Sequence, residues 1–209
     1  MSEDTHDASP PTRSRAVVVL AVPVAEPLPV ADVTRDRLED VLIADAVDSV
    51  ESLTVATVGV LCSPSQLDGV AASAGVGTAV WTGEAPTVRE AAAHAAAAGA
   101  EQVVVIASDA PHLPGLLVGK LFRPLGRVDV TVSPDPRGFA VAIGLRLPVP
   151  DWVGEFDLDQ PDVVDALLRR APRRALVRAI TGWRRLREPA DFAALHAGVD
   201  GADLTRALL

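Results

Sequence analysis

Cysteine is nearly absent from this sequence of 209 residues, which contains only Cys62. A single cysteine excludes an internal disulfide and any metal site built from several cysteines. Cys62 lies at the end of an apolar run. We therefore interpret it as a small core residue, with a reactive thiol as the alternative.

Long hydrophobic runs are also absent. No stretch of about 18 uninterrupted apolar residues occurs that could cross a membrane. Residues 1–14 carry acids, polar residues and prolines, where a secretory signal would have a basic start and an apolar stretch. We expect a cytoplasmic protein with a disordered tail over residues 1–14 and a single folded domain over residues 15–209.

The overall charge is acidic, with a formal net charge of -9 at neutral pH. An excess of negative charge disfavours binding to nucleic acid or to an anionic membrane, so neither partner is expected. The arginines are unevenly distributed, because eight of them and no acid lie between Arg169 and Arg187. This segment is either a local anion-binding face or a solvated helix end and strand edge.

Short β-branched runs alternate with segments rich in alanine and leucine. This pattern is typical of βα units, so we predict a three-layer α/β/α fold with a mostly parallel sheet. Residues 16–22 and 103–107 should form central strands, because continuous apolar runs suit burial on both faces. The remaining predicted strands are residues 53–61, 78–81, 128–132, 139–145 and 175–180, and the predicted helices are residues 32–50, 65–74, 87–98, 114–122, 161–170 and 189–196.

Asp109 comes two residues after the strand predicted at residues 103–107, at the centre of the sheet. In an open parallel sheet, ligands bind beyond the carboxyl ends of the strands. A carboxylate at that place is costly to desolvate unless it binds a cation or accepts hydrogen bonds. Pro111 and Pro114 would stiffen the loop that holds it. Asp109 is therefore a candidate site residue, with a helix cap or an Asx-turn as the alternative.

Three segments carry a resemblance to a known family. They are Ala107-Ser-Asp-Ala-Pro-His-Leu113, Ser133-Pro-Asp-Pro-Arg-Gly-Phe139 and Leu186-Arg-Glu-Pro-Ala-Asp-Phe192. With the order of strands and helices around them, residues 16–197 resemble the nucleotide-diphospho-sugar transferase superfamily of GT-A type. Within it, the chain is most similar to small bacterial glycosyltransferase-like proteins, the selenodomain-associated or arsenosugar-type transferases, and less similar to phospholactate and phosphoenolpyruvate guanylyltransferases. His112 occupies a variable position of this pattern, and we expect a solvated loop histidine.

The resemblance implies roles for particular residues. Asp109 matches the strand-end aspartate that stands next to the nucleotide and its divalent metal, and Ser108 lies beside it. Asp135, Gly138 and Phe139 match the stretch where the acceptor or the sugar normally lies. By this resemblance Asp109 and Asp135 are candidate catalytic residues, and Ser108, Gly138 and Phe139 are candidates for binding nucleotide or substrate.

The chain departs from the family pattern in the first loop and at the start of the third of these segments. The family normally holds phosphates with a first loop rich in glycine, lysine and arginine, but residues 23–30 contain no glycine and no basic residue and add the negative Glu26. Arg185 and Arg187 stand where the family has aspartates, one of which normally supplies a second metal ligand. An arginine cannot ligate a metal. We therefore expect Asp109 to pair with an arginine rather than to bind a metal tightly.

These observations leave three function hypotheses. We favour a degenerate transferase-like protein that keeps the fold as a binding or scaffolding module for a nucleotide, a nucleotide sugar, a protein partner or a second copy of the chain. The alternative is an active glycosyl- or nucleotidyltransferase that uses a nucleotide-activated donor, in which Arg185 and Arg187 neutralise the diphosphate. Mg²⁺ or Mn²⁺ would be a cofactor only if the Asp109 site were active. The third is an unrelated function on the same fold.

Overall fold

The computed structural model describes residues 14–24, 28, 30–53, 56–195 and 201–209. Three predicted features lie wholly or partly outside the described residues. They are residues 1–13 of the tail, Glu26 in the first loop, and residue 196 at the predicted end of the last helix.

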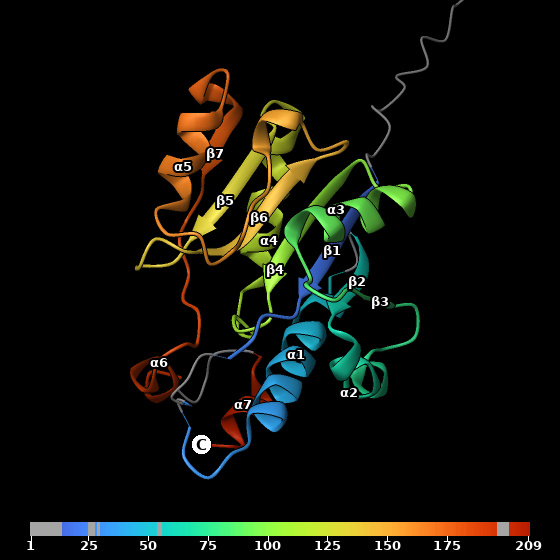
Figure 1. The fold of residues 1–209 in the computed structure, drawn as a ribbon, viewed down its shortest axis with the longest axis vertical. Helices are drawn as coiled ribbons and strands as arrows, with labels where there is room; N and C mark the ends of the chain where they lie inside the picture. Colours follow the sequence, from blue (N-terminus) through green and yellow to red (C-terminus); the bar gives the residue numbers. More distant parts are fainter. Residues whose placement is uncertain (1–13, 25–27, 29, 54–55, 196–200) are drawn as a thin grey trace, which may run out of the picture.

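A sheet of seven strands forms the middle of the molecule, in the order β3-β2-β1-β4-β6-β5-β7 (Figure 1). Only β6 runs antiparallel to its neighbours, β4 and β5. The predictions of a mostly parallel sheet and of central β1 and β4 are confirmed. The strand bounds are β1 (Arg15–Leu20), β2 (Thr57–Cys62), β3 (Ala79–Thr82), β4 (Gln102–Ala107), β5 (Val130–Pro134), β6 (Ala140–Arg146) and β7 (Val177–Ala179).

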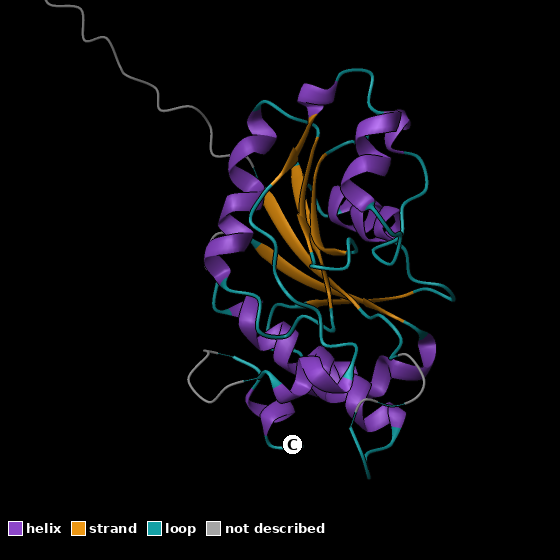
Figure 2. Ribbon diagram, turned by 90° about the vertical axis from the view of Figure 1, so that its left-hand side faces the viewer, coloured by secondary structure: helices purple, strands orange, loops and turns teal. Residues whose placement is uncertain are grey.

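Helices cover both faces of this sheet, as Figure 2 shows, so the three-layer prediction is also confirmed. One face packs against α3 and α5, and the other against α1, α2 and α4. Below the sheet in Figure 1, α7 lies beside α1, with α6 at the same end. The helix bounds are α1 (Arg35–Glu51), α2 (Leu67–Ser73), α3 (Val88–Ala97), α4 (Gly115–Phe122), α5 (Val163–Arg170), α6 (Pro189–Ala193) and α7 (Asp203–Arg206).

Local sequence explains several helix ends. Thr34 and Thr87 precede α1 and α3, and each hydroxyl accepts a hydrogen bond from a backbone N–H of the first turn. Gly99 follows α3 with a φ of 87°, the left-handed conformation that glycine adopts without strain. The predicted start of α4 differs slightly, because Pro114 is the residue before the helix rather than its first residue.

The core consists of apolar clusters on the two faces of the sheet. Val17 and Val19 of β1 point to the α1 side, and Val18 points to the α3 side, as alternation along a strand requires. Cys62 is completely buried, so its interpretation as a core residue is confirmed. None of the helices in the described part of the chain is both long and apolar enough to cross a membrane.

Several elements differ from the prediction. Strand β2 begins at Thr57, four residues later than predicted, and β7 has only three residues. Helix α7 was not predicted, because four residues are too few for a hydrophobic period to show. These differences lie at the ends and edges of the fold and leave its centre unchanged.

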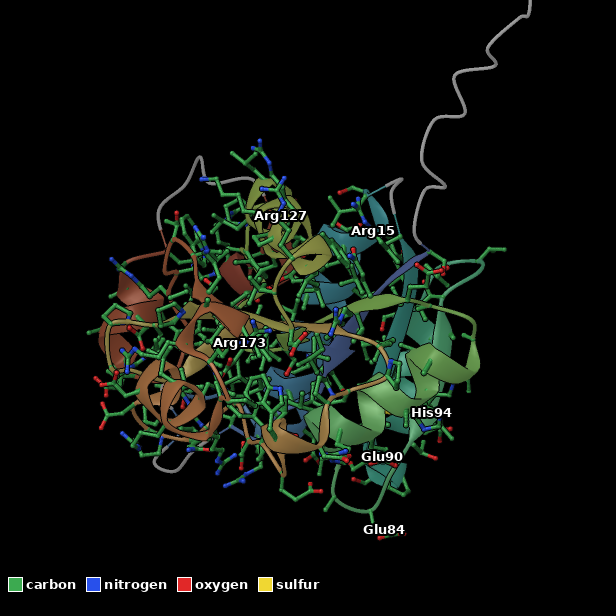
Figure 3. The ribbon with its side chains drawn as sticks, turned by 90° about the horizontal axis from the view of Figure 1, so that it is seen from above. Arg15, Glu84, Glu90, His94, Arg127 and Arg173 are labelled. Atoms are coloured by element: carbon green, nitrogen blue, oxygen red, sulfur yellow. The ribbon has the colours of Figure 1, made fainter. Side chains whose placement is uncertain are left out.

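The arginines between Arg169 and Arg187 do not form one face. Because β7 is parallel to β5, residues before β7 lie at the amino-terminal end of the sheet and residues after it lie at the carboxyl-terminal end. Figure 3 looks onto the molecule from above in Figure 1, the amino-terminal end of the parallel strands, and labels Arg173 on this side. Arg185 and Arg187 lie at the opposite end, so the arginines of this segment are divided between the two ends of the sheet.

Candidate functional site

The candidate site lies at the carboxyl-terminal rim of the sheet. Asp109 comes two residues after β4, and Asp135 directly follows β5. Phe139 directly precedes β6, which starts at this rim because β6 is antiparallel. The extended segment after β7 crosses the rim, where the Trp183 N–H donates to the Pro134 carbonyl and the Leu186 N–H donates to the Asp109 carbonyl. The topology thus brings the predicted residues to one edge.

Asp109 and Arg185 form a buried ion pair. Arg185 Nε lies 2.6 Å from Oδ1 of Asp109, and Nη2 lies 2.9 Å from Oδ2. The Arg185 side chain has no exposed surface, and Asp109 is 3 % exposed. Paired donors on a planar guanidinium match the two oxygens of a carboxylate, which gives a strong and directional contact. The expected pairing of Asp109 with an arginine is therefore present.

Asp159 and Arg187 complete what we call the rim cluster, which is Asp109, Asp159, Arg185 and Arg187. Arg185 Nη1 donates to Oδ1 of Asp159 at 2.6 Å and lies 3.2 Å from the Ala140 carbonyl. Arg187 donates to both oxygens of Asp159, at 2.9 and 2.8 Å, and its Nε lies 3.5 Å from Asp109. Two carboxylates and two guanidinium groups balance formally to zero charge.

Burial and pairing act in opposite directions on these groups. Burial raises the pKa of the Asp109 carboxyl, and the hydrogen-bonded charge of Arg185 opposes that rise. Burial alone would also raise the pKa of Asp159, but the charges of Arg185 and Arg187 outweigh it and hold that pKa below its usual range. The pKa of Arg185 is raised, because its two carboxylate partners outweigh its own burial. The bidentate contact fits an ionised pair.

A second group of charges lies next to the rim cluster. Arg137 Nε donates to Oδ2 of Asp135 at 3.0 Å, and its Nη1 donates to Oδ2 of Asp191 at 3.0 Å. Its Nη2 donates to the Arg185 carbonyl at 3.2 Å, which connects the two groups. Oδ1 of Asp135 accepts from the backbone N–H groups of Arg137 and Phe139. Asp135 is thus fully engaged within its own loop.

The other predicted residues have structural partners at the same rim. The buried Ser108 hydroxyl accepts a hydrogen bond from the Val22 N–H at 3.0 Å. Gly138 has a φ of 89°, which allows the turn between β5 and β6. The Arg187 guanidinium lies over the Phe139 ring, 5.5 Å from its centroid.

Two pockets lie near this rim. The first, which we call the Trp183 pocket, has a volume of about 550 Å³ and is lined by His112, Pro134, Asp135, Pro136, Gly182, Trp183, Arg184, Asp191, Ala194 and Leu195. The second, which we call the Leu20 pocket, has a volume of about 350 Å³ and is lined by Leu20, Pro86, Thr87, Val88, Glu155, Phe156, Asp157, Leu158 and Gln160. Asp135 is the one predicted site residue among these linings, and Asp109 borders neither pocket.

The rim residues do not fit a divalent metal. In the described part of the chain, no group of three or more histidine, cysteine, aspartate or glutamate side chains is placed to hold one. Both oxygens of Asp109 already face a guanidinium, which would repel a cation. Mg²⁺ gives up its water shell reluctantly and needs several oxygen ligands in the right geometry.

Sequence reasoning missed some of these residues. Asp159 lies in an acidic stretch with no family motif, and only its alternation with Asp157 distinguishes it. Arg137 fits no position of the family pattern, yet it holds both Asp135 and Asp191. The expectation of a solvated His112 is wrong, because this residue is 8 % exposed. The centroid of its ring lies 5.7 Å from that of Trp183. This contact joins segments far apart in the sequence, so no local pattern predicts it.

The chain resembles known proteins in its fold rather than in its sequence. No family model and no curated protein matches the sequence. Among solved structures, a Desulfovibrio desulfuricans protein provisionally described as a nucleotide-diphospho-sugar transferase is 18% identical, with a TM-score of 0.69 over 94% of this chain and 96% of its own. The chain has the fold of nucleotide-diphospho-sugar transferases.

Two further structures share this transferase fold. CMP:2-keto-3-deoxy-manno-octonic acid synthetase, complexed with CTP, is 12% identical, with a TM-score of 0.60 over 94% of this chain and 100% of its own. The Rv0371C protein of Mycobacterium tuberculosis, complexed with manganese, is 19% identical, with a TM-score of 0.56 over 95% of this chain and 98% of its own. At such identities the likeness concerns the transferase fold, and chemistry has to be argued from the site.

Proposed function

We propose that this chain is a degenerate relative of the nucleotide-diphospho-sugar transferases, close to the small bacterial glycosyltransferase-like proteins, that serves as a binding module. The observation that carries this proposal is the bidentate pair between Asp109 and the fully buried Arg185. A carboxylate whose two oxygens are held by a guanidinium faces a positive charge that repels a metal ion, and at 3 % exposure Asp109 offers little surface to a nucleotide. Releasing it would leave a buried charge without a partner, which is strongly unfavourable.

The first loop supports the same proposal. Backbone N–H groups after the first strand could hold a phosphate, but here the chain itself uses two of them. The Val22 N–H donates to Ser108, and the Val24 N–H donates to the carboxylate of Glu39 at 2.9 Å. A carboxylate of the chain itself thus occupies a position that an anionic ligand would need.

The charge of the Leu20 pocket also disfavours a diphosphate. This pocket opens beside the carboxyl end of β1 and the start of α3, next to the central strand. Its lining includes Glu155 and Asp157 and no lysine, arginine or histidine. Phosphate groups need compensating positive charge or free donors, so this pocket suits an uncharged group such as a nucleoside better than a diphosphate.

An active transferase is the second candidate, and one feature favours it. Arg187 keeps 17% of its side chain exposed, and its partner Asp159 keeps 32%. A partly exposed guanidinium could exchange Asp159 for a diphosphate of an activated donor without a metal, whereas the fully buried Arg185 could not.

Isothermal titration of the full chain with Mn²⁺, alone and with CTP, tests the proposal. We expect no stoichiometric binding of Mn²⁺ at micromolar affinity in either titration, because the rim oxygens are already paired. Release of pyrophosphate from a panel of nucleoside triphosphates should equal that of the Asp109→Asn variant.

The matched control is Asp129→Asn. Asp129 is also a buried acid that pairs with an arginine, Arg146, but it lies at the amino-terminal end of the sheet. A micromolar Mn²⁺ site that Asp109→Asn abolishes and Asp129→Asn retains would overturn the degenerate assignment. Pyrophosphate release with the same dependence would establish the active alternative.

A further inference from the structure

The Trp183 pocket has the size and the walls of a small-molecule site. Its volume of about 550 Å³ falls within the roughly 300 to 1,000 Å³ that is usual for such sites. Pro134, Pro136, Trp183, Ala194 and Leu195 supply apolar surface from three separate segments of the chain. An apolar cleft of this size favours a ligand with a ring or a short hydrocarbon body.

Two nitrogen atoms of the pocket residues lack a partner. His112 Nδ1 and Trp183 Nε1 are both buried, and neither has a hydrogen-bond partner in the described part of the chain. Most buried polar groups in proteins are satisfied, and both of these exceptions belong to residues that line the Trp183 pocket. Burial lowers the pKa of His112 to about 4, and the nearby charge of Arg184 adds to this effect. The imidazole is therefore neutral at pH 7 and can carry its one proton on Nδ1.

The charges around the pocket leave one cation uncommitted. Asp135 and Asp191 border the pocket, but Arg137 and backbone N–H groups already bind both oxygens of Asp135 and Oδ2 of Asp191. Arg184 also borders the pocket and is exposed. No hydrogen bond or ion pair holds its guanidinium among the described residues. An anion in the pocket would meet this guanidinium without having to displace a carboxylate.

We propose that the Trp183 pocket binds a small organic carboxylate with an apolar body. Because both nitrogens are closed to solvent, a small rotation of the two rings would turn the Trp183 and His112 N–H groups toward one bound carboxylate, and Arg184 would balance its charge. The two prolines and Leu195 would contact the apolar part. A phosphate ester fits less well, because its second negative charge would face Asp135 and Asp191. This inference goes beyond the proposed function, since it requires neither a nucleotide nor the rim cluster.

The test is a titration of the ¹⁵N-labelled full chain with naphthalene-2-carboxylate, followed by NMR. The sequence contains three tryptophans, so the indole N–H region holds three signals, and Trp183→Phe identifies the one from Trp183. We expect this signal to move with saturation while the signals of Trp81 and Trp152 stay in place. Naphthalene-2-carboxamide, which has the same shape without the charge, should bind about tenfold more weakly, as expected for the loss of a charge-assisted contact. Inorganic phosphate should leave the signal unchanged.

Variants separate this site from general effects on the fold. Arg184→Gln should weaken carboxylate binding severalfold and leave the thermal midpoint unchanged, because Arg184 is exposed. Arg174→Gln, an exposed arginine before β7, is the matched control and should bind like the wild type. The proposal fails if naphthalene-2-carboxylate gives no saturable shift at millimolar concentration. It also fails if the carboxamide binds equally well or if both arginine variants lose affinity alike. A negative Mn²⁺ titration has no bearing on any of these outcomes.

Discussion

Arg185 shows how a site residue can become a structural one. A carboxylate at the rim of a sheet normally contributes little to stability, but Asp109 is buried and depends on one guanidinium for both of its oxygens. Arg185 in turn joins Asp109, Asp159 and the Ala140 carbonyl, which belong to three different segments. The pair therefore connects the rim segments at the place where a bound ligand was expected.

Replacing Arg185 with methionine should therefore destabilise the protein strongly. Removing one partner of a buried pair leaves an uncompensated charge, at a cost of roughly 3 to 5 kcal/mol. Urea unfolding measures this loss, and Arg146→Met is the control. Its loss should be smaller, because the Arg146 side chain is 47% exposed and its partner Asp129 keeps a hydrogen bond from the Trp152 indole N–H. The double variant Asp109→Leu/Arg185→Met should recover much of the stability. Equal losses for Arg185→Met and Arg146→Met would contradict the structural role.

His112 should make stability depend on pH. Burial lowers its pKa to about 4 from the usual 6.5, so the unfolded chain binds a proton more readily than the folded one between these values. The contribution of His112 is complete above about pH 6.5 and declines as the pH falls toward 4. We expect a loss of about 1 to 2 kcal/mol between pH 7 and pH 5. In His112→Gln the unfolding free energy should change less over this interval, and an unchanged slope would refute the assignment.

Helix α7 is an element whose position depends on one side chain. The buried carboxylate of Asp45 in α1 accepts hydrogen bonds from the backbone N–H groups of Leu204 and Thr205 and from the Thr205 hydroxyl. A four-residue helix cannot persist without such contacts. The far end of the chain is thereby held against α1.

Asp45→Ala should therefore release α7 and leave the sheet intact. Hydrogen exchange of residues 203–206 should accelerate strongly, while exchange in β1 and β4 should keep its wild-type rate. Asp48→Ala is the matched control, because Asp48 lies on the same helix and is exposed. If Asp48→Ala accelerates exchange in α7 as much as Asp45→Ala does, the contact with Asp45 is not what holds the helix.

The contrast between predictable and unpredictable elements has a physical basis. Strands β1 and β4 are continuous apolar runs, a signal that survives in any context, and both lie at the centre of the sheet as predicted. Helix starts at Thr34 and Thr87 depend on nearby residues and were placed within a few positions. Strand β7 is short and exposed, so little hydrophobic pattern marks its ends.

The candidate site was less predictable, because its contacts join segments far apart in sequence. The position of Asp109 after a buried strand pointed to the rim, and the arginines at 185 and 187 suggested a pairing partner. Arg185 rather than Arg187 pairs with both oxygens of Asp109 because of the course of the segment after β7. Asp159 contacts Arg185 because of the course of the loop before α5. Both segments are irregular, so no hydrophobic periodicity in the sequence predicts where they run.

At the scale of the whole molecule, the sheet unites both halves of the chain. The antiparallel pairing of β4 with β6 joins the first four strands to the last three. The apolar cluster on each face also spans this junction, with Val17 and Val141 on one side and Val18 and Ile143 on the other. Neither half could keep its core covered if the other unfolded, so the domain predicted over residues 15–209 should behave as a single cooperative unit.

Unfolding in urea should accordingly show one transition at both edges of the sheet. Trp81 lies in the edge strand β3, whereas Trp183 follows β7 at the opposite edge. In Trp81→Phe the fluorescence reports on Trp152 and Trp183, and in Trp152→Phe/Trp183→Phe it reports on Trp81 alone. Each variant should give the same midpoint by fluorescence and by far-ultraviolet circular dichroism, because a single transition makes all probes coincide. If Trp81 lost its signal at a clearly lower urea concentration than the circular dichroism, the β2 and β3 edge would unfold separately and the chain would contain two cooperative units.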